Sequence, residues 1–402
     1  MANVSSSNGL EKRPKLRFPG FDEPYRTTLL GEIASLVNRT DPKSNAPIMM
    51  LSAGNGFIMQ SEKYSRDNAG QSLKKYILLK QGELAYNHGA SKAKQFGCCY
   101  ELTEPEARIP YVYHCFKINE DEYTPYVAMA LNNAKMDQQL KRLVSSSVRM
   151  DGLLNISFED YMSVTLHLPS FIEQKHIADF LTKLDERIAY QERLITSLKK
   201  YKRGLHKLVF IKKRKHSWEK SALHDIASFC GGGTPSKDVS SYWEGEIGWI
   251  SSSDIQEEWI DDISVTRRIT KTAIDNSATK LCPEGTIAIV SRVGVGKVAI
   301  MPESLCTSQD FTNITSITGN THYMAYQIAF RMKLEAMKTQ GTSIKGVTAD
   351  TIKAMVLDIP PLEEQKKIAD MLTAFDAYIK RAVCELDLFL AMKKALLQQL
   401  FI

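Results

Sequence analysis

LPSFIEQKHIADFLTKLDERI (168–188) and IPPLEEQKKIADMLTAFDAYI (359–379) decide the fold of this 402-residue chain. The two stretches align without a gap at a constant offset of 191 residues, and 11 of their 21 positions are identical. Self-similarity at a fixed period indicates that one structural unit has been repeated along the chain. We therefore expect two copies of one plan.

Fainter repeats extend this plan to the segments that come before each of the two stretches. YRTTLLGEIAS from Tyr25 matches WEKSALHDIAS from Trp218, and GELAYNHGASKAK (82–94) matches GTIAIVSRVGVGK (285–297). Each copy thus consists of a long variable segment followed by a short segment that is similar in both copies.

The short segments have the apolar spacing of a coiled-coil helix, in alternating steps of four and three residues. Both carry a lysine, Lys202 or Lys393, at the same step. The first seam is Ile177, Leu181, Leu184, Ile188, Gln191, Ile195, Leu198, Lys202, Leu205 and Val209, and the second is Ile368, Leu372, Phe375, Ile379, Ala382, Leu386, Phe389, Lys393, Leu396 and Leu400.

Two helices with matching seams most simply bury those seams against each other. The long variable segment between them can return the chain to the far end, so we expect an antiparallel pair with approximate two-fold symmetry. At 1.5 Å per residue each helix would be about 60 Å long and could act as a ruler. The alternative is that each seam packs on its own globular domain.

The variable segments have the pattern of mixed α/β domains. KYILLK (75–80) and GTIAIVSR (285–292) are typical of short strands, and residues 124–142 and 322–338 are typical of helices. Three glycines at 231–233, followed by Thr-Pro, predict a loop.

Composition is that of a globular protein, with 43% hydrophobic and 24% charged residues. The start of the chain has no apolar core, and no stretch is apolar for the roughly 18 residues of a membrane span, so we expect a cytoplasmic protein.

The seven cysteines lack paired metal-site spacing, so we expect free thiols and no metal. A net charge of +6 and nine Lys or Arg within 199–215 favour an acidic partner, although a solvated helix end is an equal alternative.

Motifs of catalysis and nucleotide binding are not supported. GVGKVA (294–299) formally matches a dinucleotide fingerprint, but the residues after it do not predict the helix that this site requires. The serines of SSSD (251–254) and SSS (145–147) lack a nucleophile elbow. The carboxylate pairs at 257–258 and 261–262 lie in a polar stretch, for which we expect a solvated surface.

GGGTPSKDVSSYWEGEIGWISSSDI (231–255), the two repeated stretches and the opening LRFPGF (16–21) resemble the specificity subunits of type I restriction-modification systems. The resemblance covers nearly the whole chain. It implies two α/β target recognition domains joined by an antiparallel coiled coil of two long helices. The implied divisions are a polar tail (1–14), recognition domain 1 (15–167), a central helical spacer (168–212), recognition domain 2 (213–358) and a C-terminal helical spacer (359–402).

The resemblance also implies a function. Each recognition domain would read one half of a bipartite, asymmetric site in double-stranded DNA, and the helices would set the gap and recruit two methyltransferase subunits, with restriction/translocase subunits as further partners. The chain itself would be no enzyme. Adenine methylation with S-adenosylmethionine, and cleavage driven by ATP with Mg²⁺, would belong to the partner subunits.

Loops with small hydroxyl side chains, glycines and cations suit contacts with phosphates and base edges. The first domain departs from the family phrase, having VNRTDPKS (37–44) where the second has GGGTPS. The candidate DNA-binding residues are Asn87, Ser91, Lys92, Lys94, Ser145, Ser146 and Arg149 in the first domain, and Lys237, Ser251, Ser252, Ser253, Arg292, Lys297, Thr342, Ser343 and Lys345 in the second.

Two other hypotheses stay open. The chain could be a structural adaptor whose coiled coil joins other proteins and whose basic charge is incidental. It could also be an enzyme such as a fused methyltransferase, although the sequence lacks a recognisable cofactor motif. Sequence-insensitive DNA binding would favour the adaptor, and binding of S-adenosylmethionine to the isolated chain would favour the enzyme.

Overall fold

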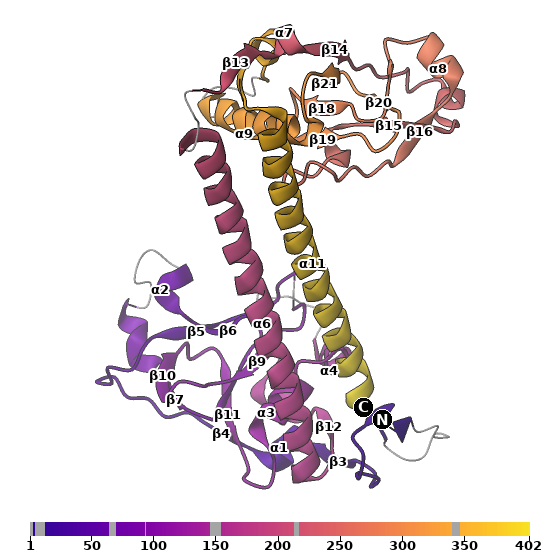
Figure 1. The fold of residues 1–402 in the computed structure, drawn as a ribbon. Coiled ribbons are helices and arrows are strands. Elements are labelled where there is room, and N and C mark those ends of the chain that lie inside the picture. The colour runs from indigo at the N-terminus through magenta and orange to yellow at the C-terminus, as the bar shows by residue number, and fades with distance from the viewer. Residues whose placement is uncertain are drawn as a thin grey trace. The chain divides into compact units, whose positions relative to one another are not determined.

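The computed structural model describes residues 3–4, 13–63, 70–92, 94–144, 154–212, 217–339 and 346–402. The chain divides into two compact units, one made of Met1–Gln191 with Glu385–Ile402 and the other of Glu192–Cys384. Each unit holds one globular domain and part of both long helices, α6 (Phe171–Lys207) and α11 (Leu362–Leu400) (Figure 1).

The first unit is built on an antiparallel sheet of four strands in the order β4-β11-β8-β9. The other strands pair two by two, as β1 with β2, β12 with β3, β10 with β7 and β5 with β6. The strands are β1 (Asn3–Val4), β2 (Leu16–Arg17), β3 (Arg26–Leu29), β4 (Ala34–Leu36), β5 (Met49–Ser52), β6 (Gly56–Met59), β7 (Ile77–Lys80), β8 (Leu84–Asn87), β9 (Cys98–Glu101), β10 (Glu106–Ile109), β11 (His114–Ile118) and β12 (Thr165–Leu168). The helices are α1 (Leu30–Ile33), α2 (Gln60–Lys63), η1 (Gly70–Lys75), α3 (Thr124–Ala130), α4 (Ala134–Leu143) and α5 (Phe158–Met162).

The second unit repeats this sheet as β14-β21-β18-β19 and adds another four-stranded sheet, β16-β15-β20-β17. Strand β13 pairs with β22. The strands are β13 (Glu219–Ala222), β14 (Ala227–Gly231), β15 (Ile247–Ile250), β16 (Arg267–Ile269), β17 (Leu281–Cys282), β18 (Ile287–Val290), β19 (Val298–Ile300), β20 (Leu305–Thr307), β21 (Phe311–Ile317) and β22 (Val356–Ile359). The helices are η2 (Leu208–Lys212), α7 (Leu223–Ile226), η3 (Ser240–Trp243), η4 (Ser252–Asp254), α8 (Lys271–Asp275), α9 (Thr321–Thr339) and α10 (Ala349–Lys353).

The two domains therefore follow one plan. The shared sheet has the same strand order in both, and the β3–β12 pair of the first corresponds to the β13–β22 pair of the second. Each plan ends on a strand that leads directly into a long helix, β12 into α6 and β22 into α11. This confirms the expectation of two similar mixed α/β domains with long helices.

Each repeated stretch contains a buried glutamine, Gln174 or Gln365, that makes the same two hydrogen bonds in both copies. The side chain of Gln174 donates to the carbonyl of Pro169 and accepts from the backbone N–H of Tyr123. Gln365 makes the same two bonds, to the carbonyl of Pro360 and from the N–H of Asn320. In each domain one amide side chain thus ties the start of the long helix to the start of the helix that covers the sheet.

The two long helices pair in an antiparallel sense. In the first unit Asp185 of α6 lies 2.5 Å from the Nζ of Lys393 of α11. In the second unit the equivalent residues of the repeat form the same ion pair, with the lysine now on α6 and the aspartate on α11. The Nζ of Lys202 lies 2.6 Å from the carboxylate of Asp376. All seam positions of both helices are buried or half-buried. The antiparallel coiled coil expected from the sequence is confirmed, and the two seam lysines are the cations of these ion pairs.

Two local predictions need correction. Residues 124–142 form two helices instead of one, because the side chain of Asn132 bonds to the backbone of Cys99 and the side chain of Asn133 caps α4 by accepting from two backbone N–H groups. Strand β14 continues into the glycine run as far as Gly231, so only the last two glycines belong to the loop. The helix predicted at 322–338 is confirmed as α9.

Each domain has its own apolar core, and both long helices contribute to it. The core of the first includes Ile177 and Leu181 from α6 and Phe401 from the end of the chain, which stacks on Tyr126 at 5.1 Å between ring centroids. The core of the second includes Leu372 from α11 and Phe210, which lies just after α6. The C-terminal end of α11 therefore packs in the core of the first domain, and the residues that follow α6 pack in the core of the second.

Candidate nucleic-acid interface

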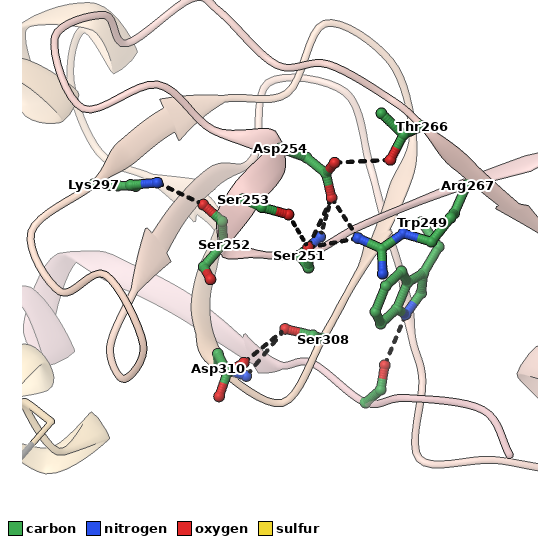
Figure 2. A network of polar contacts seen from close by, with 11 residues as sticks. Trp249, Ser251, Ser252, Ser253, Asp254, Thr266, Arg267, Lys297, Ser308 and Asp310 are labelled. Atoms are coloured by element: carbon green, nitrogen blue, oxygen red, sulfur yellow. Dashed lines mark hydrogen bonds and ion pairs between the residues drawn. The ribbon is translucent and has the colours of Figure 1, made fainter. Parts of the chain in front are cut away.

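Several loops of the second domain meet near the ends of β15, β18 and β20. The N–H of Ser308, after β20, donates to the carbonyl of Ile250, and the N–H of Ser291, after β18, donates to the carbonyl of Asp310. The Nζ of Lys297 donates to the carbonyl of Ser252 at 2.8 Å. The sequence-predicted residues Ser251, Ser252, Ser253 and Lys297 are therefore brought together from loops 45 residues apart (Figure 2).

The glycine run lies in this group of loops for a steric reason. A Cβ on Gly232 would lie 1.9 Å from the carbonyl oxygen of Ser308, and one on Gly233 would lie 2.5 Å from the backbone of Ala278. The carbonyl of Gly233 accepts from the Nε1 of Trp249 at 2.9 Å. These glycines are therefore required by close packing of the protein's own backbone.

Asp254 holds the loop after β15 in place (Figure 2). Its carboxylate accepts from the backbone N–H and hydroxyl of Ser251, from the hydroxyl of Thr266 and from the guanidinium of Arg267, at 2.7 to 2.9 Å. Burial alone raises the pKa of Asp254, but the hydrogen bonds from Ser251, Thr266 and Arg267 outweigh it and hold the pKa below its usual value. The guanidinium of Arg267 also lies 4.5 Å from the centre of the Trp249 ring.

A cleft lies beside these loops, with a volume of about 730 Å³. Its lining combines the rings of Phe229 and Phe311 with the side chains of Arg292, Asp310 and Lys353. The side chain of Arg292 is exposed, and its loop turns through Gly294 and Gly296, which both have positive φ. This stretch then enters strand β19, so the GVGKVA sequence lacks the following helix of a dinucleotide site.

The predicted residues of the second domain differ in their availability. Lys237, Ser253 and Arg292 are exposed. The hydroxyl of Ser251 and the ammonium of Lys297 are already bonded within the domain. Thr342, Ser343 and Lys345 lie outside the described residues.

The first domain presents an equivalent loop between β8 and β9. Lys94 occupies the place of Lys297 in the repeat, and its Nζ also donates to a backbone carbonyl, that of Asn132, at 2.7 Å. Ser91 forms a turn with Lys94, and the side chain of Asn87 accepts from the N–H of Gly89. Lys92 is exposed at the tip. Ser145, Ser146 and Arg149 lie outside the described residues.

The divergent VNRTDPKS phrase has the same place in the fold as GGGTPS. It follows β4, which pairs with β11 as β14 pairs with β21. Its turn is closed by Asp41, whose carboxylate accepts from the N–H of Lys43 at 3.0 Å, instead of by closely packed glycines. The two loops are thus equivalent in position and different in construction.

Sequence reasoning missed the residues that organise the second site, chiefly Asp254, Arg267 and Trp249. The Ser251-x-x-Asp254 spacing is that of a capping box and could have pointed to Asp254. The contribution of Arg267 has no such signal, because it comes from a neighbouring strand and depends on the tertiary structure.

Residues of both charged stretches form ion pairs. Part of the basic run near the end of α6 is neutralised, because Lys199 pairs with Glu258 at 2.7 Å and Lys202 with Asp376. Glu258 and Asp261, expected on a solvated surface, are each 48% exposed but paired with helix lysines. Among the described residues, no group of His, Cys, Asp or Glu side chains could hold a metal ion. None of the described helices is long and apolar enough to cross a membrane.

Comparison with known proteins gives consistent results. The family model described as "Type I restriction modification DNA specificity domain" matches residues 215–383. The type I restriction enzyme MjaIX specificity subunit of Methanocaldococcus jannaschii is 34% identical over 167 residues, which are 40% of this chain and 39% of that protein. The EcoR124I/EcoR124II specificity subunit of Escherichia coli is 31% identical over 186 residues, 44% of this chain and 45% of that protein. The matched regions thus span less than half the length of these two relatives.

Structural comparison covers more of the chain. The crystal structure of a type I restriction-modification system S subunit from M. genitalium matches with a TM-score of 0.60 and 13% identity, over 97% of this chain and 99% of that one. At this identity the match shows the fold alone. The repeated helical stretches, the two domains of one plan and the matching family model agree: this chain is similar to the specificity subunits of type I restriction-modification systems.

Proposed function

We propose that this chain is the DNA sequence-reading subunit of a type I restriction-modification complex. Each domain binds one half of a bipartite, asymmetric site in double-stranded DNA, and the helix pair sets the gap between the halves. The observation that carries this proposal is the occurrence, in one chain, of two domains of the same plan whose equivalent loops differ in sequence. One plan explains a shared way of binding, and different loops explain two different half-sites.

The loops after β8 and β18 are the parts of each domain that we assign to DNA. Lys92 in the first and Arg292 in the second are exposed cations on equivalent hairpins. Lys94 and Lys297 hold these hairpins by bonds to backbone carbonyls, so they support the loops instead of projecting from them. Exposed Lys237 adds a cation from the glycine-rich loop.

The chemistry belongs to partners in this proposal. The helix pair and its flanks recruit two methyltransferase subunits, which bind S-adenosylmethionine and methylate adenine at N6. Restriction/translocase subunits, where they join, use ATP and Mg²⁺ for translocation and cleavage. The chain itself recognises DNA without catalysing a reaction, and the complex works in the cytoplasm.

The decisive experiment compares the adenine methylomes of cells that express the cognate methyltransferase with and without this chain. A bipartite motif with a fixed internal gap, present only when the chain is expressed, is the expected result. Identical methylomes, in cells where the complex is shown to form, would contradict the proposal and favour a structural adaptor.

A further inference from the structure

A short acidic loop of the second domain, Gln256–Asp262, lies across the helix pair. The loop is closed at its base by a β-bridge between Ile255 and Ile263. Just outside this bridge, the N–H of Ser264 donates to the carbonyl of Asp254 at 2.8 Å. The base of the acidic loop is therefore continuous with the Asp254 network that organises the candidate DNA-binding loops.

The acidic loop is anchored in its own domain by Ile260. This side chain is 5% exposed and belongs to the core that also contains Val298 and Leu372. Its carbonyl accepts from the N–H of Ile300, on the edge strand β19, at 2.6 Å. The middle of the loop is thus tied to the sheet by both its side chain and its backbone.

On its other side the acidic loop contacts both helices. Glu258 pairs with Lys199 of α6, and Asp261 pairs with Lys380 of α11, each at 2.7 Å. Two ammonium groups lie close to the ring of Trp259, with the Nζ of Lys202 at 4.8 Å and that of Lys380 at 5.3 Å from its centre. The Nζ of Lys202 also donates to the carbonyl of Glu258 at 2.6 Å.

These contacts act together more strongly than isolated surface ion pairs would. A single exposed ion pair contributes little, because two long side chains must be held in place for a screened attraction. Here the four consecutive residues from Glu258 to Asp261 all make contacts, and a single conformation of the loop backbone places all four side chains. The Lys202 side chain is only 14% exposed, so its attraction to the Trp259 ring is less screened by water.

We propose that the acidic loop is a clamp that fixes the second domain on the helix pair and so determines how strictly the chain selects the gap between half-sites. This role rests on the proposed reading of a bipartite site. A recognition domain that can tilt on its helices would reach a half-site at several distances, whereas a clamped domain reaches it at one.

The test uses the full chain and its reconstituted complex with the cognate methyltransferase subunits. The clamp variant combines Glu258→Gln, Trp259→Ala and Asp261→Asn. Glu257→Gln is the matched control, because it removes a neighbouring charge of the same loop without touching the described contacts with the helices. Two readouts are taken: hydrogen exchange of the backbone amides in 255–263 and 298–300, and methylation of DNA substrates whose gap is varied by one base pair.

In the clamp variant we expect amide exchange in these segments to be about tenfold faster, since several weak contacts are lost together. Methylation of substrates with a gap one base pair longer or shorter is expected to rise about tenfold relative to the preferred gap. The Glu257→Gln control is expected to behave like the unmodified chain in both readouts.

A charge exchange covers the case in which the triple variant fails to fold. Asp261→Lys alone should loosen gap selection, and Asp261→Lys with Lys380→Asp should restore it in part, because the ion pair re-forms while the contact of Lys380 with the Trp259 ring does not. Unchanged exchange in the clamp variant, or faster exchange with unchanged gap selection, would overturn the clamp. If the unmodified chain directs no bipartite methylation at all, the proposed function fails and the gap role fails with it, which the unmodified complex reveals before any variant is made.

Discussion

His206, near the C-terminal end of α6, is held in an apolar environment. The rings of Phe210 and Tyr326 lie 5.9 Å from its ring, centroid to centroid, and that of Phe330 lies 6.5 Å away. Burial, assisted by the positive charges of Lys202 and Lys333, lowers the pKa of His206 to about 3. The folded second domain therefore keeps this imidazole neutral at pH values where the unfolded chain would protonate it.

This depressed pKa predicts a loss of stability in mild acid. The contribution of His206 is fully present above the unfolded pKa of about 6.5 and is lost as the pH falls toward the folded pKa, because only the unfolded chain takes up the proton. At pH 5 the expected loss is about 2 kcal/mol. All four tryptophans lie between 218 and 259, so their fluorescence during urea unfolding reports on the second unit. His206→Phe should remove this part of the pH dependence, and an unchanged slope would contradict it.

Arg292 and Lys297 lie on one hairpin and are expected to respond differently to truncation. Arg292→Ala removes an exposed cation, so it should weaken binding to DNA that carries the second half-site. The slope of the logarithm of the binding constant against the logarithm of the salt concentration should become shallower by about one for each lost phosphate contact. Lys297→Met removes the bond to Ser252 and should also reduce the stability of the second domain. Lys92→Ala is the matched control in the first domain. Binding measured over a salt series would contradict the assignment if Arg292→Ala had no effect.

At the scale of elements, the same ion pair occurs twice in the helix pair, in different surroundings. Lys202 and Asp376 are 14% and 2% exposed, whereas Lys393 and Asp185 are 33% and 43% exposed. Burial raises the pKa of Asp376 despite the nearby ammonium, and burial lowers the pKa of Lys202. Both shifts indicate that the buried pair forms at a considerable desolvation cost.

The two pairs should therefore respond unequally to the same substitution. Asp376→Ala removes the carboxylate partner of the largely buried Lys202 ammonium, which keeps only its bond to the carbonyl of Glu258 and its contact with Trp259, and is expected to cost about 3 kcal/mol of unfolding free energy. Asp185→Ala removes an exposed partner and should cost about 0 to 1 kcal/mol. Lys202→Met with Asp376→Leu should recover most of the loss, because neither charge remains buried. Urea unfolding followed by circular dichroism at 222 nm measures all three, and equal costs for the two aspartates would contradict this argument.

The helices could be predicted from the sequence because a heptad seam repeats locally, and burial then follows from the period of the helix. The ion pairs could not, since Asp185 and Lys393 meet only after a whole domain has returned the chain. The candidate site shows the same division. Exposed loop cations such as Arg292 could be proposed from composition, but the Asp254–Arg267 bond and the contacts of Trp259 depend on strands and helices that the sequence does not place together.

At the scale of the whole molecule, the sequence suggests that lengthening α6 by four residues after Ile188 would lengthen the ruler by about 6 Å. The structure adds a condition to this expectation. Ile188 lies between Asp185 and Lys202, whose partners lie on the other helix. An insertion in α6 alone would therefore leave one of the two ion pairs out of register.

A matched insertion satisfies this condition. We insert four residues after Arg193 in α6 and four after Cys384 in α11. Both insertion points lie midway between the two ion pairs, so both pairs can re-form. An insertion of four residues is a stutter, which a coiled coil accommodates by local unwinding. The expected result is that the doubly lengthened chain methylates substrates with a gap about two base pairs longer, since 6 Å is nearly twice the 3.4 Å rise of DNA. The single insertion in α6 serves as the control and should lower both stability and methylation. A folded double variant that kept the original gap would show that the helices do not measure it.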